Sequence, residues 1–231
     1  MGRDDLVKLS VSNLSASYGR TAALSDVTFD VDQGVLGILG LNGAGKTTLI
    51  KAICGLIPHT GKAEIAMPQS DHPLDVLFDN SAAARPRWRV EEYLAFFRTQ
   101  DKRVGRFPIT GPQEVAIEPL LHRAVGGLSA GQRRQVELRR VLESSADIAL
   151  LDEPTRELDA KAKLDFWEAL SAQADAGRVF LVLSHDTMEI QTVCDRALLL
   201  QHGRIMRELD CDETHHLTIQ SFRELLEDNG A

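Results

Sequence analysis

Hydrophobic and polar residues alternate along two stretches near the N-terminus, 6–14 and 27–31, as they do in strands with one buried face. Three continuous apolar runs, at 35–39, 148–151 and 179–183, are instead typical of strands buried on both faces. Helical spacing of apolar residues follows the first run at 47–53 and separates the other two at 159–174. Strands that alternate with helices predict an α/β fold with a mostly parallel sheet and crossover helices.

The middle of the chain has a different pattern. Residues 70–125 contain no buried-strand run, carry five prolines and include one amphipathic helix at 90–98. We therefore predict a helical subdomain over 70–133, inserted into a core formed by 1–69 and 134–231. A last helix, with apolar residues at 219, 222, 225 and 226, is expected to pack against that core.

Composition narrows the class of protein. The 231 residues (25.5 kDa) are 43% hydrophobic and 26% charged, which suits one globular domain with an insertion. The net charge of −8 and a pI near 5.4 argue against nucleic acid as a partner. The longest apolar stretch, 34–41, is too short to span a bilayer, and the acidic start does not resemble a signal peptide. Three widely spaced cysteines suit a reducing cytosol. Such a chain would reach a membrane only through a partner.

A phosphate-binding loop stands between the predicted strand 35–39 and the helix that follows. The motif GxxxxGK[ST] is complete, and its glycines let backbone N–H groups approach phosphate oxygens at the positive end of a helix. The lysine supplies charge for the β- and γ-phosphates, and the threonine a hydroxyl for Mg²⁺. The sequence thus predicts binding of a nucleoside triphosphate by Gly40, Asn42, Gly43, Ala44, Gly45, Lys46, Thr47 and Thr48.

Two carboxylates follow the buried run 148–151. Asp152 and Glu153 come at the carboxyl end of this strand, where ligands collect in parallel sheets. Asp152 is placed to hold Mg²⁺ directly or through water, and Glu153 to polarise an attacking water as general base. Adjacent acids alone would suit a solvated turn equally well, and the phosphate loop decides in favour of the metal site.

The run Leu-Ser-Ala-Gly-Gln at 128–132 resembles the signature of ATP-binding cassette (ABC) ATPases, usually Leu-Ser-Gly-Gly-Gln. Further matches follow in the family's order, from the Asp-Glu-Pro-Thr run at 152–155 to the Ser-His-Asp run at 184–186. The resemblance covers residues 6 to about 207. It implies the P-loop NTPase (RecA-like) fold with an antiparallel β edge and an inserted helical subdomain.

The resemblance also implies roles for residues with little signal of their own. Tyr18 would stack on adenine, although alone it reads as a half-buried aromatic. Gln69 would contact the metal and sense the γ-phosphate, and His185, by itself an ordinary polar residue, would hydrogen-bond that phosphate or the water. Ser129 and Gly131 would contact the γ-phosphate held by a second subunit.

Four features depart from the family's pattern or invite another reading. Ala130 replaces a signature glycine, and charged Arg156 and Glu157 stand where the D-loop usually has small residues. Only 22 residues separate Lys46 from Gln69, so the antiparallel edge is expected to be shortened, with 63–67 as its remainder. Four arginines, at 133, 134, 139 and 140, are expected to form a solvated helix face.

The implied function is the ATP-binding and ATP-hydrolysing subunit of an ABC transporter. It would act as a dimer of two cassettes, for which we favour a homodimer over a heterodimer. It would lie on the cytoplasmic face of the membrane through a separate permease, and of the two directions we favour export. The alternatives are a soluble ABC ATPase that serves cytosolic partners, as in iron–sulfur assembly or repair, and a cassette that only binds ATP.

Overall fold

The computed structural model describes residues 7–66, 74–77, 85–101, 107 and 117–227. The chain divides into two compact units. Residues 1–68 and 179–231 form what we call the terminal unit, and residues 69–178 form the middle unit. None of the described helices is long and apolar enough to cross a membrane.

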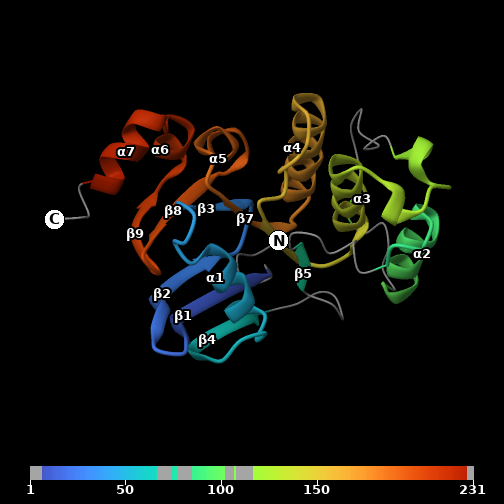
Figure 1. Ribbon diagram of the computed structural model, residues 1–231. Coiled ribbons are helices and arrows are strands. Elements are labelled where there is room, and N and C mark those ends of the chain that lie inside the picture. Colours follow the sequence, from blue (N-terminus) through green and yellow to red (C-terminus); the bar gives the residue numbers. More distant parts are fainter. Residues whose placement is uncertain (1–6, 67–73, 78–84, 102–106, 108–116, 228–231) are drawn as a thin grey trace. The chain divides into compact units, whose positions relative to one another are not determined.

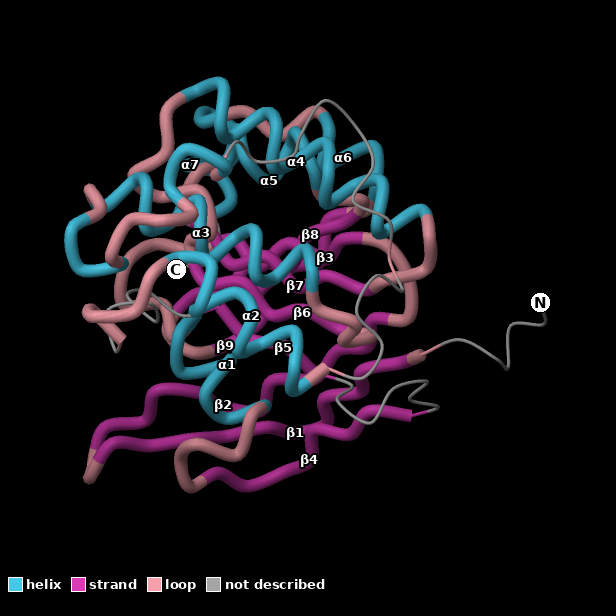
Figure 2. The backbone as a smooth tube through the Cα atoms, turned by 90° about the vertical axis from the view of Figure 1, so that its right-hand side faces the viewer, coloured by secondary structure: helices cyan, strands magenta, loops and turns pink. Residues whose placement is uncertain are grey.

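The terminal unit contains a three-stranded antiparallel sheet in the order β2-β1-β4 (Figure 1). Inward-facing residues of β1 and β2 alternate with exposed ones, which confirms the alternation seen in the sequence. Helix α1 contacts all three strands and lies along one face of their sheet (Figure 2). The elements are β1 (Lys8–Tyr18), β2 (Thr21–Val31), β4 (His59–Ala66) and α1 (Lys46–Ile53).

The prediction that only residues 63–67 remain of this antiparallel edge gave too short a range. Strand β4 begins at His59, four residues earlier, and Met67 lies outside the described residues. The first half of β4 is exposed and polar, so it carries no apolar alternation. It also contains Gly61 at φ +84°, where a Cβ atom would lie 2.3 Å from the carbonyl oxygen of Asn13. Pairing with β1 therefore defines a strand that its own residues do not indicate.

The second sheet of the terminal unit is parallel in its centre. Strand β3 lies between β7 and β8, and β9 joins β8 in antiparallel orientation. Helix α5 contacts β3 and β7, α6 contacts β8 and β9, and α7 follows with Phe222 buried. The elements are β3 (Val35–Leu39), β7 (Val179–Ser184), β8 (Arg196–Gln201), β9 (Arg204–Leu209), α5 (Thr187–Val193), α6 (Cys211–His215) and α7 (Ile219–Glu227).

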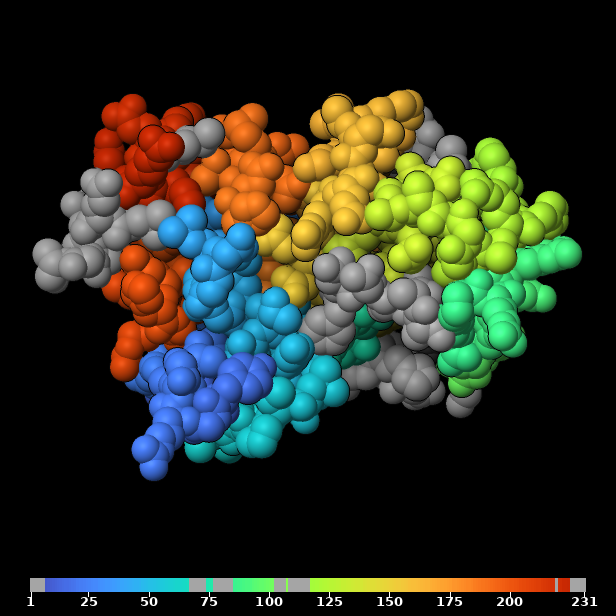
Figure 3. All heavy atoms as spheres, viewed as in Figure 1, coloured from blue at the N-terminus to red at the C-terminus, as the bar shows by residue number. Residues whose placement is uncertain are grey.

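The two sheets of the terminal unit touch through the turn between β8 and β9. The amide of Ser25 in β2 donates to the carbonyl of Gly203 at 2.8 Å. In the space-filling view, the blue surface of the N-terminal strands adjoins the orange-red surface of β9 (Figure 3). Residues far apart in the sequence thus meet beside the phosphate loop, because the Gly203 amide also donates to Ala44 within that loop at 2.9 Å.

The middle unit contains most of the predicted helices. Strands β5 and β6 pair in parallel, and α3 contacts β5, α2 and α4. The elements are β5 (Leu74–Leu77), α2 (Val90–Gln100), α3 (Ala130–Glu143), β6 (Ile148–Asp152) and α4 (Ala160–Asp175), with 3₁₀ turns at Glu118–Leu120 and Val125–Gly127.

One strand lies where the sequence indicated none. The four residues of β5 fall inside the range predicted as helical, and they pair with β6 from Leu74–Ile148 to Leu77–Leu151. The compact units also separate at 68/69 and at 178/179, because α3 packs on both β5 and α4. The subdomain limits of 70–133 stay a prediction.

Candidate active site

The predicted phosphate loop joins β3 to α1. All five residues of β3 are buried, and the amide of Gly40 donates to the carbonyl of Ser184 at 3.3 Å. A Cβ atom on Gly40 would lie 2.5 Å from the carbonyl oxygen of Leu200, so only glycine fits where the loop leaves the sheet. Gly43 and Gly45 have φ of +85° and +107°, which favours glycine. The motif's glycines are therefore required by the backbone of this turn.

Lys46 is the first residue of α1 and only 7% exposed. Its Nζ donates to the carbonyl oxygens of Gly40 at 2.6 Å and Leu41 at 3.3 Å. A buried ammonium needs such partners, and they hold its charge over the loop. Thr47 is exposed and Thr48 is half-buried on the first turn of the same helix, where the backbone is electropositive. The Lys46 ammonium group and the electropositive first turn of α1 together fit the negative charge of a polyphosphate.

Two other loop residues differ in their surroundings. Asn42 is exposed, whereas Ala44 is buried. The amide of Ala44 donates to Leu41 at 3.1 Å, and its carbonyl accepts from Gly203. Ala44 therefore anchors the loop to the turn between β8 and β9.

His185 follows β7 at the same edge of the sheet as the phosphate loop. Strands β3 and β7 run parallel with Leu39 opposite Ser184, so the chain leaves both strands on one side. The Ser184 hydroxyl donates to buried Glu189 at 2.8 Å and accepts from the Asp186 amide at 3.0 Å. These bonds turn the chain sharply and leave His185 exposed. The structure thus brings His185 and the phosphate loop to one edge of the sheet, and the role of His185 toward a γ-phosphate stays a prediction.

Tyr18 is the last residue of β1 and is 52% exposed. It pairs with Thr21 across the turn to β2. An exposed ring at the end of a hairpin is available for stacking, so the half-buried alternative does not describe it. Stacking on adenine stays a prediction.

The two predicted carboxylates end strand β6 in the middle unit. Asp152 is 7% exposed at the last position of the strand, and Glu153 is half-buried. Glu153 has φ +48°, an uncommon conformation for a residue other than glycine. The backbone therefore turns out of the strand at this residue. Uncommon backbone conformations of this kind cluster at active sites.

The signature residues form the start of α3. The Ser129 hydroxyl accepts from the Gln132 amide at 3.2 Å, and the Ser129 amide donates to Oε1 of Gln132 at 3.1 Å. This reciprocal capping box satisfies two amides at the first turn. Gly131 lies against the backbone of Glu157, and a Cβ atom at this position would clash with that backbone.

The D-loop residues are exposed. Arg156 and Glu157 both face solvent, and Glu157 has φ +69°. Asp159 caps α4 by accepting from the Ala162 amide at 2.8 Å. A local capping role thus accounts for Asp159 within one chain.

The expected solvated arginine face on α3 is wrong. Arg134 and Arg140 are 5% and 8% exposed. Arg140 donates to Asp75 at 2.8 and 3.0 Å, which ties α3 to β5. Arg134 donates to the carbonyl at the end of β6 and to the next two carbonyls after it. Neither contact has a sequence signal, because both partners lie far away in the chain.

The predicted site is divided between the two units. The terminal unit carries the phosphate loop, Tyr18 and His185, and the middle unit carries the signature residues and the carboxylates after β6. Gln69 lies outside the described residues. The roles of these residues as one site therefore stay predictions.

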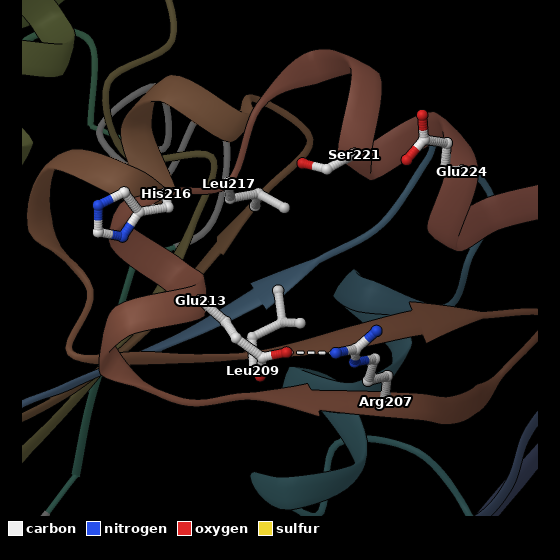
Figure 4. Close-up of a pocket in the computed structure, with 7 residues that line it drawn as sticks. All are labelled: Arg207, Leu209, Glu213, His216, Leu217, Ser221 and Glu224. Carbon is white, nitrogen blue, oxygen red and sulfur yellow. Dashed lines mark hydrogen bonds and ion pairs between the residues drawn. The ribbon is translucent and has the colours of Figure 1, made fainter.

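A separate pocket of about 320 Å³ lies near the C-terminus, between β9 and helices α6 and α7 (Figure 4). Its charged groups are partly paired with each other, since Arg207 forms an ion pair with Glu213. The lining residues are Arg207, Leu209, Glu213, His216, Leu217, Ser221 and Glu224, and none belongs to the predicted site.

Comparison with known proteins identifies the class to which this fold and these motifs belong. The family model described as ABC transporter matches residues 24–156, from β2 to the D-loop. The chain therefore belongs to the ABC transporter family.

Individual relatives have names for both directions of transport. The phosphonates import ATP-binding protein PhnC 1 of Natronomonas pharaonis is 32% identical over 86% of this chain and 91% of its own length. The cytochrome c biogenesis ATP-binding export protein CcmA of Chelativorans sp. is 32% identical over 78% of this chain and 92% of its own. The chain spans only 44% and 50% of two other relatives, a putative ABC transporter ATP-binding protein of Treponema denticola and the spermidine/putrescine import ATP-binding protein PotA of Bacteroides thetaiotaomicron.

Solved structures confirm the fold class. A structure described as the ATP binding subunit of an ABC transporter matches with a TM-score of 0.74. The two sequences are 24% identical, and the match covers 96% of this chain and 95% of the chain in that structure. The α/β cassette fold predicted from the sequence is therefore the observed one.

Proposed function

We propose that this chain uses ATP hydrolysis to drive a substrate through a separate membrane permease. The phosphate loop carries the proposal. Its turn is fixed by glycines after a buried strand, and the Lys46 ammonium is held over it by the carbonyls of Gly40 and Leu41. A buried cation at a helix N-terminus beside exposed backbone fits the triphosphate of ATP.

Mg²⁺ would be held by oxygen ligands of the predicted site. The Thr47 hydroxyl, the Asp152 carboxylate and the Gln69 side chain would provide the hard oxygen ligands that this ion prefers. When bound, the ion neutralises charge on the β- and γ-phosphates.

In the proposed reaction, Glu153 accepts a proton from water while the water oxygen attacks the γ-phosphorus. The bond to the β–γ bridging oxygen breaks, which releases ADP and phosphate. His185 would hydrogen-bond the γ-phosphate, and Tyr18 would stack on adenine. Ser129 and Gly131 would contact the γ-phosphate held by a second cassette.

We further propose a homodimer of two cassettes on the cytoplasmic face of the membrane, bound to the permease. Export is the direction that we propose. Relatives named for import and for export both match this chain, so the permease partner is the natural object of the test.

The test is co-purification of the tagged chain from mildly solubilised membranes, with partners identified by mass spectrometry. An unrelated tagged protein carried through the same steps is the control. We expect a protein with several membrane spans in stoichiometric amount, and its relatives would assign the direction. Recovery of soluble partners alone would overturn the transporter and favour a soluble ABC ATPase.

A further inference from the structure

Arg134 binds the backbone that carries the two predicted active-site carboxylates. Its Nη2 donates to the carbonyl oxygens of Asp152 at 2.9 Å and Glu153 at 2.5 Å, and its Nε donates to that of Pro154 at 2.7 Å. One side chain thus holds three consecutive carbonyls. All four residues belong to the middle unit.

The guanidinium group is suited to this task in a way that other cations are not. Three carbonyls in a turn require several donors in a fixed plane, and arginine presents five in a rigid fork. The charge is compensated within α3, because Glu137 lies 3.3 Å away and is itself buried. A buried, paired guanidinium is costly to displace, so its contacts are expected to be rigid.

The turn that Arg134 holds is strained at Glu153, the proposed general base. Glu153 has φ +48°, and its carbonyl accepts from the Arg156 amide at 3.2 Å as well as from Arg134. Residues in this conformation persist only where the surroundings fix them. The Arg134 bonds on either side of the Cα atom of Glu153 therefore hold the backbone from which its carboxylate projects.

We propose that Arg134 is a positioning residue, which orients the Glu153 carboxylate for hydrolysis and couples it to the signature helix. This rests on the proposed role of Glu153 as general base. Ser129 caps the same helix five residues earlier, so a displacement of the α3 start, for example on contact with a phosphate, moves the Arg134 fork and the carboxylate together. Figure 1 shows α3 beside α4, which begins just after this segment.

The test compares Arg134→Lys with Arg139→Lys, a matched change on the same helix at a residue paired with Glu143. Arg134→Lys keeps the charge but loses the fork. We expect its kcat to fall about 10²-fold, the effect of a displacement near 1 Å, with KM for ATP changed less than about threefold. Arg139→Lys should retain kcat within about twofold. A folded Arg134→Lys protein with wild-type kcat would overturn the proposal.

Two further variants separate positioning from a structural role. In the Glu153→Gln background, Arg134→Lys should lower kcat no further, because both changes act on one group. An additional loss of similar size would overturn positioning through Glu153. Full activity of Glu153→Gln alone would instead refute the general base and so the proposed function. Should Arg134→Lys not fold, Arg134→Gln combined with Glu137→Gln removes both buried charges and is held to the same kcat criterion.

Discussion

Gly131 in the signature lies directly against the backbone of Glu157 in the D-loop. A Cβ atom on Gly131 would stand 2.7 Å from the Glu157 carbonyl oxygen, closer than carbon and oxygen atoms approach. The neighbouring position is already alanine, so the loss of one signature glycine at 130 is tolerated where that at 131 is not. The start of α3 therefore touches the segment after β6 at two places, here and through Arg134.

Gly131→Ala should therefore destabilise the protein and slow hydrolysis. The new methyl group meets backbone rather than a flexible side chain, and overpacking of this kind costs about 1–3 kcal/mol. Urea unfolding and ATPase rates measure the two effects. Gly127→Ala is the control, because a Cβ atom there would meet nothing within 4 Å, and we expect it to stay within about 0.5 kcal/mol of the wild type. Equal stability of the two variants would show that the D-loop backbone moves and accommodates the methyl group without cost.

Lys46→Ala should abolish the stabilisation that ATP gives. A ligand at about 100 times its Kd raises the free energy of unfolding by about 2.7 kcal/mol, and Lys46 supplies the charge at the loop. Urea unfolding with and without Mg-ATP measures this gain. Lys51→Ala, in the last turn of the same helix, should keep it. A gain that persists in Lys46→Ala would place the nucleotide elsewhere.

Glu153→Gln should lower the hydrolysis rate by about 10²–10⁴-fold and leave ATP binding intact, because it removes a general base without changing the shape of the side chain. Single-turnover rates and equilibrium ATP binding, measured on one preparation, separate the two properties. Glu168→Gln, at an exposed position of α4, is the matched control and should hydrolyse ATP at the normal rate. Undiminished hydrolysis by Glu153→Gln would exclude it as the base.

The three cysteines should react with alkylating reagents in a fixed order. Burial raises the pKa of the Cys54 thiol to about 11 and that of the Cys194 thiol well above its usual value, so little thiolate forms near neutral pH. Cys211 is exposed. We expect iodoacetamide at pH 7.5 to label Cys211 first and Cys194 only after unfolding, as followed by peptide mass spectrometry. Rapid native labelling of Cys194 would mean that the sheet opens around it. Cys211→Ser identifies the fast phase.

Local patterns predicted much of the fold and of the site. The phosphate loop could be found from the sequence because its turn needs positive φ angles, which favour glycine. The strand before it could be found because five consecutive residues are apolar. The helix start at Ser129 is likewise a local matter, since the cap and its partner Gln132 are three residues apart.

What the sequence determined by itself is thus the set of elements whose causes lie within a few residues: the buried strands, the phosphate loop and the capped helices. Only the tertiary structure decided that Arg134 and Arg140 turn inward and that residues 74–77 form a strand. The reason is physical, because a buried charge or a four-residue strand is stable only beside its partner. Those partners, Pro154 and Asp75 for the arginines and β6 for the strand, are distant in sequence and become neighbours only in the folded chain.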